Sequence, residues 1–562
     1  MSKYNNSAWN PGLEPETPRE YQQLETIYRP ENVDSSIDDT EELSRLTGLN
    51  HEELIVFKPE RLAVHELIIR VTADIVVPEG EDELDLGRNF RRIAGTILTD
   101  FVEPHIVEIQ KAWYDLHIRV HQMVHGVLGE TLFKTPDTKT QKKGLLHFLF
   151  QGKYGSESRP NELTHVREHR VLLKFKEKGL AEDDPLTRAV YRSLYRILDS
   201  IAANRGFLGP DKSLLARLVC DHVCNNHGSR VIGELIAPWI DQAIERNGYL
   251  RVPNAKSPLL ISLKGASAAG KSSLRPMLRQ TFKQQGVSSD GYATISPDIW
   301  RRFLLDFESL GNAFKYAGRL TSKEVILIDS KLDHYIRNKA NRNGSIPHLL
   351  VDRFRFDSFA SEKISKILYG TYVKYVDTMY MYFVVTPPEE TVERGWERGR
   401  KTGRYKAVED FLDHSVEAHT GMPKIFFKWL AFEKPFFRYE FLDNSVPKGT
   451  YPTTIAFGEQ QEMNIVDISA FINIERYQKI NIKAKTPQQV YPDNSILLAL
   501  NNIGFLKQCI KKIPTVNFVD QATSTVYACT RNGIPEILDA SIFDEKLIDE
   551  EFAQVFSAIG FK

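Results

Sequence analysis

Cysteine is scarce in this sequence, with four residues in 562. That content excludes a small disulfide-stapled secreted scaffold and is typical of chains that fold in a reducing cytosol. The start of the chain lacks the basic and apolar pattern of a signal peptide. No apolar run approaches the roughly 20 residues that span a bilayer. We therefore expect a cytoplasmic protein that does not contact a membrane.

An excess of charge of one sign is also missing. The formal net charge is −1, from 73 basic and 74 acidic side chains, so no global field favours nucleic acid or an anionic lipid surface. Apolar residues make up 42% of the chain and charged residues 26%, which is ordinary globular composition. A chain of this length should form several domains. No internal repeat is evident in it.

The composition and the apolar pattern of the sequence change along the chain and predict four regions. Residues 1–50 are polar and acidic with scattered prolines, which predicts a disordered lead. Residues 51–250 carry apolar residues at helical spacing and predict a mostly helical domain without an assigned role. Residues 251–445 alternate strands with helices, and residues 446–562 form a mixed α/β tail whose fold the pattern does not specify.

The alternating region predicts an α/β core with a doubly wound, mostly parallel sheet. The candidate strands are Leu259–Leu263, Tyr292–Ile295, His348–Val351, Met379–Val385 and Tyr439–Leu442. Ligands bind such sheets beyond the carboxyl ends of the strands. Functional side chains should therefore follow these strands.

The first strand runs into a phosphate-binding loop. The pattern G-x-x-x-x-G-K-[ST] is matched, with one further serine, by Gly265, Ala266, Ser267, Ala268, Ala269, Gly270, Lys271, Ser272 and Ser273. Glycines let backbone N–H groups surround phosphate oxygens. Lys271 would contact the β- and γ-phosphates of ATP, and the Ser272 hydroxyl would bind Mg²⁺. Pro276 is expected to bend the helix that follows.

A carboxylate follows the second strand, in the segment Thr294-Ile-Ser-Pro-Asp298-Ile-Trp-Arg301. At that edge of the sheet Asp298 would take the proton from an acceptor hydroxyl that attacks the γ-phosphate. The alternative is that Asp298 is only a helix N-cap, which is common at such a turn. The sequence leaves both interpretations open.

Four arginines occur within eleven residues after the fourth strand: Arg394, Arg398, Arg400 and Arg404. The glycines between them favour a mobile lid over a rigid amphipathic helix, with guanidinium groups that close over phosphate charge. The alternative is a solvated basic surface.

Together these three elements, in this order, resemble the zeta-toxin family of P-loop small-molecule kinases over residues 255–445. The likeness also includes Glu324 at the start of a long helix and the strand that ends in Asp352. It implies that Lys271 and Ser272 handle phosphates and magnesium and that Asp298 is the base. It also implies that Glu324 helps to hold the acceptor and that Arg394 and Arg404 stabilise transferred charge.

Two departures from the family pattern concern the acceptor side. The third strand ends in Asp352-Arg-Phe-Arg, where the family has a Glu-Gly-Thr type of ending. Asp352 is therefore a candidate substrate-binding residue, at a position where the family pattern has a different residue type. The spacing of the arginines differs as well, so Arg398 or Arg400 could replace either lid arginine. The family's substrates include UDP-N-acetylsugars, and related bacterial effector kinases phosphorylate NAD.

These features predict an ATP-dependent kinase that acts on a hydroxyl of a small nucleotide-like metabolite. One alternative is a P-loop switch or ATPase that acts on a protein partner, and another is a polynucleotide 5′-kinase, against which the balanced charge counts. An antitoxin-like or other regulatory partner is left open. The acidic run from Asp544 to Glu551 resembles signals of type IV secreted effectors, although an acidic helix start explains it equally well.

Overall fold

The computed structural model describes residues 6–82, 84–133, 163–353, 374–447 and 449–561. The chain forms two compact units, each built from separate stretches. The sheet unit comprises Met1–Gln22, Ile68–Gly95 and Asn247–Lys562, and the helical unit comprises Gln23–Leu67 and Thr96–Arg246. The helical region expected over residues 51–250 is thus divided between the two units. The division falls near or within helices α4 (Pro59–Asp74), α5 (Asp85–Ile97) and α10 (Ser229–Asn247).

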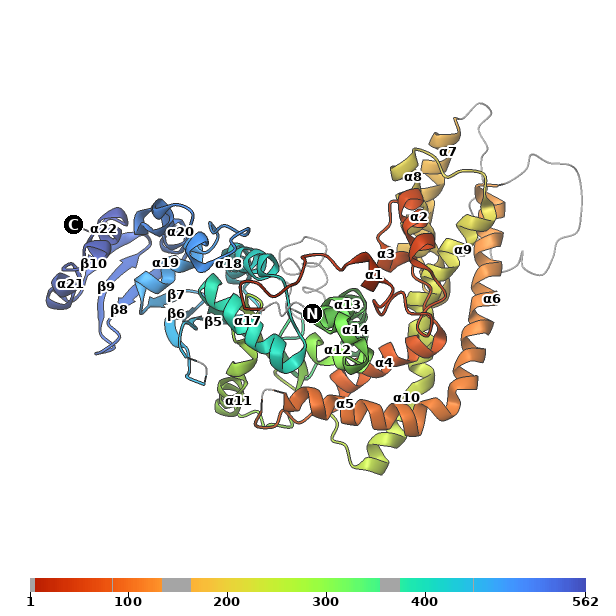
Figure 1. The fold of residues 1–562 in the computed structure, drawn as a ribbon, viewed down its shortest axis with the longest axis horizontal. Helices are drawn as coiled ribbons and strands as arrows, with labels where there is room; N and C mark the ends of the chain where they lie inside the picture. The colour runs from red at the N-terminus through yellow and green to blue at the C-terminus, as the bar shows by residue number, and fades with distance from the viewer. Residues whose placement is uncertain (1–5, 83, 134–162, 354–373, 448, 562) are drawn as a thin grey trace, which may run out of the picture. The chain divides into compact units, whose positions relative to one another are not determined.

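The helical unit is an array of helices (Figure 1), and local sequence signals set several of their ends. Its further helices are α2 Ile37–Thr47, α3 His51–Leu54, α6 Ile106–Thr131, α7 Thr164–Ala181, α8 Pro185–Arg205 and α9 Lys212–Val223. In α8, for example, Asp184 caps the first turn by accepting from the Thr187 N–H, and Gly206 ends the helix at a φ of 81°. The predicted loops over 135–143 and 152–160 lie outside the described residues.

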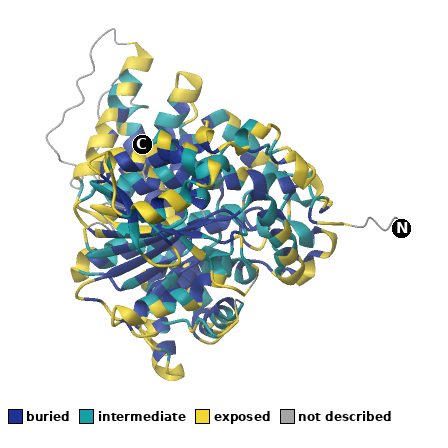
Figure 2. Cartoon of the chain, turned by 90° about the vertical axis from the view of Figure 1, so that its left-hand side faces the viewer, coloured by how far each residue is buried: buried dark blue, intermediate teal, exposed yellow. Residues whose placement is uncertain are grey.

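Ten strands of the described chain form one sheet in the order β10-β9-β8-β7-β6-β5-β4-β1-β3-β2. Five lie where the sequence predicts strands: β1 Leu259–Gly265, β2 Tyr292–Ile295, β3 His348–Val351, β4 Thr378–Val385 and β5 Phe436–Asp443. They pair in parallel in the order β2-β3-β1-β4-β5. The predicted parallel core is therefore confirmed. Figure 2 shows these strands as buried, dark blue elements between helices.

Besides the parts of α4 and α5 that fall in it, the sheet unit contains helices that precede, connect and follow the strands. They are α1 Arg19–Gln22, α11 Arg275–Gln284, α12 Arg301–Leu304, α13 Ala317–Leu320, α14 Ser322–Asn343, α17 Pro388–Thr402, α18 Val408–Leu430, α19 Ile468–Arg476, α20 Gly504–Lys512, α21 Ala540–Lys546 and α22 Glu550–Ala558. Pro276 lies in the first turn of α11, where its missing N–H removes no helical bond, so the expected bend has no cause there.

The C-terminal tail extends the sheet of the core. Its strands are β6 Thr453–Glu459, β7 Glu462–Ile465, β8 Thr515–Val519, β9 Val526–Arg531 and β10 Ile534–Ile537. β7 and β8 are parallel, whereas the other new pairs are antiparallel. The complete sheet is therefore mixed. Within the acidic run, Asp549 caps α22.

An internal repeat, which the sequence did not reveal, builds this tail. The series β5-β6-β7-α19 is repeated as β8-β9-β10-α21, and the first strand pair of each copy carries a register shift at the same place. Both copies end in an aspartate N-cap of nearly equal geometry, with φ and ψ of −132° and 102° at Asp467 and of −130° and 100° at Asp539. Both aspartates donate their N–H to the equivalent carbonyl, on Ile455 and Tyr527.

The N-terminal segment also differs from expectation, because residues 6–50 are folded rather than a disordered lead. Ala8 belongs to a buried apolar cluster with Val392, Phe411 and Leu412, and Trp9 packs against it. The Trp9 indole N–H also donates to Glu393 at 2.8 Å. Farther on, α2 begins at the cap Ser36, in the helical unit. A few anchoring residues thus order a segment whose average composition suggests disorder.

Candidate active site

The phosphate loop connects β1 to a short 3₁₀ turn, Lys271–Leu274, that leads into α11. Two residues of the loop have left-handed backbone conformations, Ala268 at a φ of 64° and Gly270 at 89°. A Cβ atom on Gly270 would lie 2.3 Å from the side-chain nitrogen of Asn444, so only glycine fits. Alanine in this region costs about 1 kcal/mol or more, and such strain is typical of a ligand-binding loop.

Side chains from two neighbouring strand ends support this loop. The Thr386 hydroxyl, just beyond β4, donates to the Ala269 carbonyl at 3.1 Å. The Asn444 amide, just beyond β5, donates to the same carbonyl at 2.7 Å. Sequence reasoning missed both residues, although Thr386 directly follows a predicted strand and Asn444 lies two residues beyond another.

Lys271 folds over its own loop. Its ammonium group donates to the carbonyls of Gly265 at 2.9 Å and Ala266 at 3.0 Å. Burial lowers its pKa, which the negative charges of Asp352 and Asp298 partly offset. An ammonium group held against a glycine-containing loop between a strand and a helix is a site for a polyanion.

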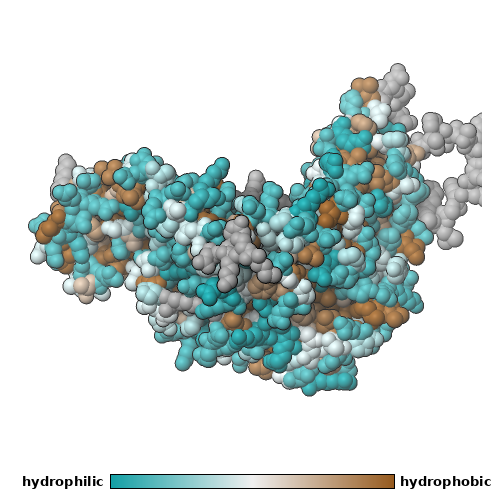
Figure 3. Space-filling view, viewed as in Figure 1, coloured by the Kyte–Doolittle hydropathy of each residue, from teal (hydrophilic) through white to brown (hydrophobic). Residues whose placement is uncertain are grey.

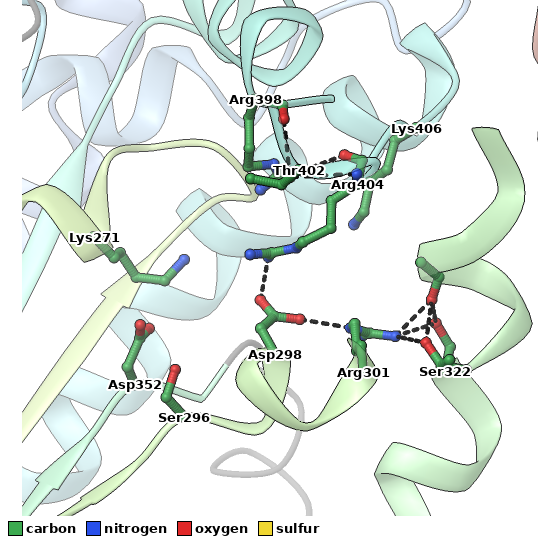
Figure 4. A network of polar contacts seen from close by, with 12 residues as sticks. Lys271, Ser296, Asp298, Arg301, Ser322, Asp352, Arg398, Thr402, Arg404 and Lys406 are labelled. Carbon is green, nitrogen blue, oxygen red and sulfur yellow. Dashed lines mark hydrogen bonds and ion pairs between the residues drawn. The ribbon is translucent and has the colours of Figure 1, made fainter. Parts of the chain in front are cut away.

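Asp298 lies in a 3₁₀ turn, Pro297–Trp300, between two arginines (Figure 4). Its carboxylate accepts a hydrogen bond from Arg301 at 2.8 Å and another from Arg404. The N-cap position is Ser296, so the interpretation of Asp298 as the N-cap is wrong. Arg301 is itself held by the Gly318 carbonyl at 2.5 Å and by the Thr321 hydroxyl at 2.9 Å.

The arginines control the charge of this carboxylate. Burial alone would raise the pKa of Asp298, but Arg404, Arg301 and Arg398 together hold it well below its usual range. The side chain is 37% exposed. Asp298 is therefore ionised and accessible from solvent.

A cavity of about 360 Å³ opens beside Asp298. Its wall comes from several elements of the sheet unit, including the phosphate loop at Ser267, the β3 end at Asp352 and the N-terminal segment at Leu13 and Glu14. The basic residues of the wall are Arg301, Lys315, Arg319, Arg353, Arg398, Arg404 and Lys406, and the acidic ones are Glu14, Asp298, Asp329, Asp352 and Asp410. Sequence reasoning identified only four of these twelve, namely Asp298, Asp352, Arg398 and Arg404.

Ion pairs fix much of this wall. Arg319 pairs with Asp410 at 2.7 Å, and the buried Arg353 pairs with Asp333 at 2.7 Å. Lys406 contacts His414 at 2.8 Å between Nζ and Nδ1. Burial lowers the pKa of both groups, that of His414 to about 2. The pair therefore supplies at most one positive charge to the cavity.

Most of the arginine-rich stretch belongs to the helix α17, not to the loose lid that its glycines suggested, and Arg404 follows the end of this helix. Gly395 and Gly399 make room for aromatic rings, since Cβ atoms there would lie 2.1 Å from the Phe411 ring and 2.3 Å from the Tyr405 ring. Gly403 then ends the helix at a φ of 73°. The glycines thus serve packing and termination rather than mobility.

The structure separates the four arginines. Arg398 and Arg404 line the cavity. Arg394 bonds to Glu390 at 2.5 Å and to the Val446 carbonyl at 2.9 Å, and lies beside Gly270. Arg400 is exposed and outside the cavity wall, so its expected contact with substrate is not supported.

Glu324 does not reach the cavity either. It is completely buried in α14, while Ser322, Val325 and Asp329 of the same helix line the wall. The expected contact of Glu324 with an acceptor is therefore not supported. The residues described contain no group of three or more His, Cys, Asp and Glu side chains that could hold a metal ion. No helix among them is long and apolar enough to cross a membrane.

Comparison with known proteins gives only distant structural likenesses. No family model matches the sequence, and no curated protein matches it. A structure of AvrRxo1-ORF1:AvrRxo1-ORF2 with sulphate ions is 12% identical, with a TM-score of 0.29, over 39% of this chain and 63% of that chain. The same complex with ATP is 13% identical, with a TM-score of 0.27, over 39% and 63%.

A further solved structure comes from the PezAT chromosomal toxin-antitoxin system of Streptococcus pneumoniae. It is 15% identical, with a TM-score of 0.26, over 39% of this chain and 80% of that chain. This chain thus matches less than two thirds of the AvrRxo1-ORF1 structures. At these TM-scores the likenesses carry no argument, and the description of the fold rests on the strand order of this chain.

Proposed function

We propose that this protein is an ATP-dependent phosphotransferase that moves the γ-phosphate of ATP to a hydroxyl group of a small nucleotide-like molecule, of the UDP-N-acetylsugar or NAD type. The observation that carries the proposal is the position of Asp298. Its carboxylate lies in a cavity that also opens on the phosphate loop, at the carboxyl edge of a parallel sheet. A hydroxyl bound in this cavity would have a proton acceptor on one side and the transferable phosphate on the other.

The charge of the cavity supports an anionic acceptor. Seven basic side chains line it against five acidic ones, and several of the acids are already paired with arginines. Guanidinium groups bind phosphate oxygens through paired hydrogen bonds. A sugar or nucleoside that carries a diphosphate fits this wall better than a neutral alcohol does.

Magnesium fits the donors at the phosphate loop. The Ser272 hydroxyl follows Lys271, and the Asp352 carboxylate lies at the end of β3 and on the cavity wall. One hydroxyl and one carboxylate, completed by substrate phosphates and water, are typical protein ligands for Mg²⁺. When bound, the ion would neutralise charge that develops on the phosphates. We therefore assign Asp352 to the metal rather than to the acceptor.

Arg404 links phosphate binding to the basicity of Asp298. In the structure the Arg404 guanidinium group donates a hydrogen bond to the carboxylate, and the pKa of Asp298 is lowered. A phosphate group in the cavity would compete for the guanidinium group. Once Arg404 turns to phosphate, Asp298 loses its strongest positive neighbour and becomes a better proton acceptor. Arg301 would keep the carboxylate in place.

The decisive experiment is the substitution Asp298→Asn. Purified protein is incubated with ATP labelled in the γ-phosphate and a metabolite extract, and mass spectrometry identifies the metabolite that gains the label. Loss of the base should reduce its phosphorylation by about 10²–10⁴-fold. ATP affinity measured by calorimetry should change little, because the hydrogen bonds and ion pairs of Asp298 among the described residues are with Arg301 and Arg404, outside the phosphate loop.

The variant Lys271→Ala provides the matched comparison, since it should lose ATP affinity while keeping its fold. Acceptor phosphorylation at the wild-type rate in Asp298→Asn would refute the mechanism. Release of ADP without any labelled metabolite, equally in wild type and Asp298→Asn, would instead support the P-loop ATPase or switch.

A further inference from the structure

The internal repeat allows the β10 edge of the sheet to be compared with the interface between β7 and β8 in the same chain. β7 in the first copy and β10 in the second occupy equivalent places, each following a hairpin and preceding an aspartate-capped helix. β7 is covered by β8, which adds to it in parallel. β10 is the last strand of the sheet.

One side chain that is buried on β7 has an exposed apolar counterpart on β10. Ile465 is only 2% exposed, whereas its counterpart Ile537 is 41% exposed. The neighbouring Ile534 and Leu538 are 70% and 45% exposed. Figure 3 shows hydrophobic, brown surface at this C-terminal end of the sheet. Such residues on an open edge are unusual unless something covers them.

The backbone of β10 also offers hydrogen-bonding groups outward. Asn532 and Gly533, with φ of 51° and 79°, form a two-residue turn of the tight hairpin kind. The flanking pair Arg531 and Ile534 is therefore the hydrogen-bonded one, and the backbone groups of residues 535 and 537 point away from β9. The equivalent residues of β7, Met463 and Ile465, lie opposite Val516 and Phe518 of β8.

We propose that the β10 edge is a docking site for an extended segment of a partner protein, which adds to the sheet as a parallel strand in the way that β8 adds to β7. The repeat defines the chemistry of that segment. It should carry alternating apolar side chains, with a large one opposite Ile537, as Phe518 lies opposite Ile465. Main-chain bonds would supply affinity and the alternating side chains would supply specificity.

Pro535 argues against a second copy of this chain as the occupant. It stands where β7 has Met463 and lacks the outward N–H. Two β10 strands paired about a twofold axis would each lack the N–H donor at Pro535, so two hydrogen bonds would be lost. A different strand paired with β10 would lose only one. The proline thus weakens pairing of β10 with itself more than pairing with a partner strand.

The test uses a synthetic peptide with the sequence of β8, PTVNFVD (Pro514–Asp520), as the probe. The full chain is labelled at isoleucine methyl groups, and the peptide is titrated in by NMR. The methyl signals of Ile534 and Ile537 should shift and saturate, while a peptide with aspartate in place of the phenylalanine should have no effect. Ile537→Lys should abolish the shift at Ile534 and leave the remaining isoleucine signals in place, which shows that the fold is intact.

Pro535→Met restores the donor that β7 has and should tighten peptide binding by about fivefold, the value of one added hydrogen bond. Absence of any shift with the β8 peptide in both wild type and Pro535→Met would overturn the proposal. Shifts at Ile534 and Ile537 that depend on protein concentration alone, together with a dimer in sedimentation, would overturn it in favour of pairing between two copies.

Discussion

At the scale of single residues, Asp298 shows how arginine neighbours set the chemistry of the site. Two guanidinium groups hold the carboxylate ionised, and one of them, Arg301, is locked by a carbonyl and a hydroxyl. Arg404 has no such second support among the hydrogen bonds described here for its guanidinium group. It is therefore the arginine that is free to exchange a carboxylate for a phosphate.

Arg404 and Arg400 make a matched pair for testing this role. Arg404→Ala should lower kcat for acceptor phosphorylation by about 10³-fold or more, as loss of a charge-stabilising arginine does in other phosphotransferases. Arg400→Ala, four residues earlier and exposed, should leave kcat within about twofold, as surface substitutions do. Steady-state kinetics at saturating ATP measures both. Equal effects in the two variants would support the alternative that the stretch is a solvated basic surface.

At the scale of elements, the helix α17 explains where sequence reasoning failed. Glycine disfavours a helix by about 1 kcal/mol, so the run of arginines and glycines favours a loose lid when only the sequence is considered. The rings that fill the space over Gly395 and Gly399 belong to Phe411 and Tyr405. Those contacts exist only after the next segment folds back, and no local pattern announces them.

The substitution Gly395→Ala distinguishes a packing glycine from a flexible one. Its Cβ would lie 2.1 Å from the Phe411 ring, and overpacking of this kind costs about 1–3 kcal/mol of unfolding free energy. A glycine present only for mobility would instead gain about 1 kcal/mol on becoming alanine. The control is Gly95→Ala in α5 of the same unit, where a Cβ meets nothing within 4 Å and stability should rise.

Thermal unfolding of both variants gives the sign directly. A higher Tm for Gly395→Ala than for wild type would show that the Phe411 ring leaves room for a Cβ atom at this position. It would then support the interpretation of the arginine-rich stretch as a mobile lid.

The N-terminal segment is a second element that composition misjudged. Leu13 and Glu14 line the cavity, Lys315 donates to the Pro11 carbonyl at 2.9 Å, and Trp9 anchors the segment. Deletion of residues 1–16 should therefore lower acceptor phosphorylation by raising the KM for the acceptor. ATP affinity should fall less than the KM rises, because the segment meets the phosphate loop through the apolar packing of Ala268 against the cluster of Ala8 and Trp9. An unchanged KM for the acceptor, once the labelled metabolite is known, would show that the segment is only a structural brace.

At the scale of the whole molecule, the sequence predicted half of the sheet, the phosphate loop and four of the twelve charged residues on the cavity wall. The parallel strands were visible because each is a short buried apolar run, and the phosphate loop because its chemistry requires a fixed spacing. The tail was not, because its repeat shares few identities, among them Ala456 with Ala528 and Phe471 with Phe543. Strand register and capping geometry carry that likeness, and neither can be read from composition.

Both units contain buried histidines, and this leads to a prediction for the whole protein. Burial lowers the pKa of His222 and His227 in the helical unit and of His419 in the sheet unit to about 4, and that of His414 to about 2. In the unfolded chain a histidine has a pKa near 6.5. Between pH 6.5 and 4 these histidines therefore bind more protons in the unfolded state, and their contribution to stability falls as the pH falls.

His419 is the clearest test of this pH dependence. It is completely buried in α18, and its Nδ1 atom donates to the Ser415 carbonyl at 2.7 Å. At pH 5 the shift corresponds to about 2 kcal/mol of lost stability relative to pH 7. His419→Asn keeps a donor for that carbonyl but cannot take up a proton. Its Tm should be lower than that of wild type at pH 7, yet should decline less between pH 7 and pH 5. The ionised Asp298 does not confuse the comparison, because its lowered pKa places its own loss of stability below this window. Parallel declines of Tm in wild type and His419→Asn would mean that this histidine is protonated within the folded protein, and that its burial does not control acid stability.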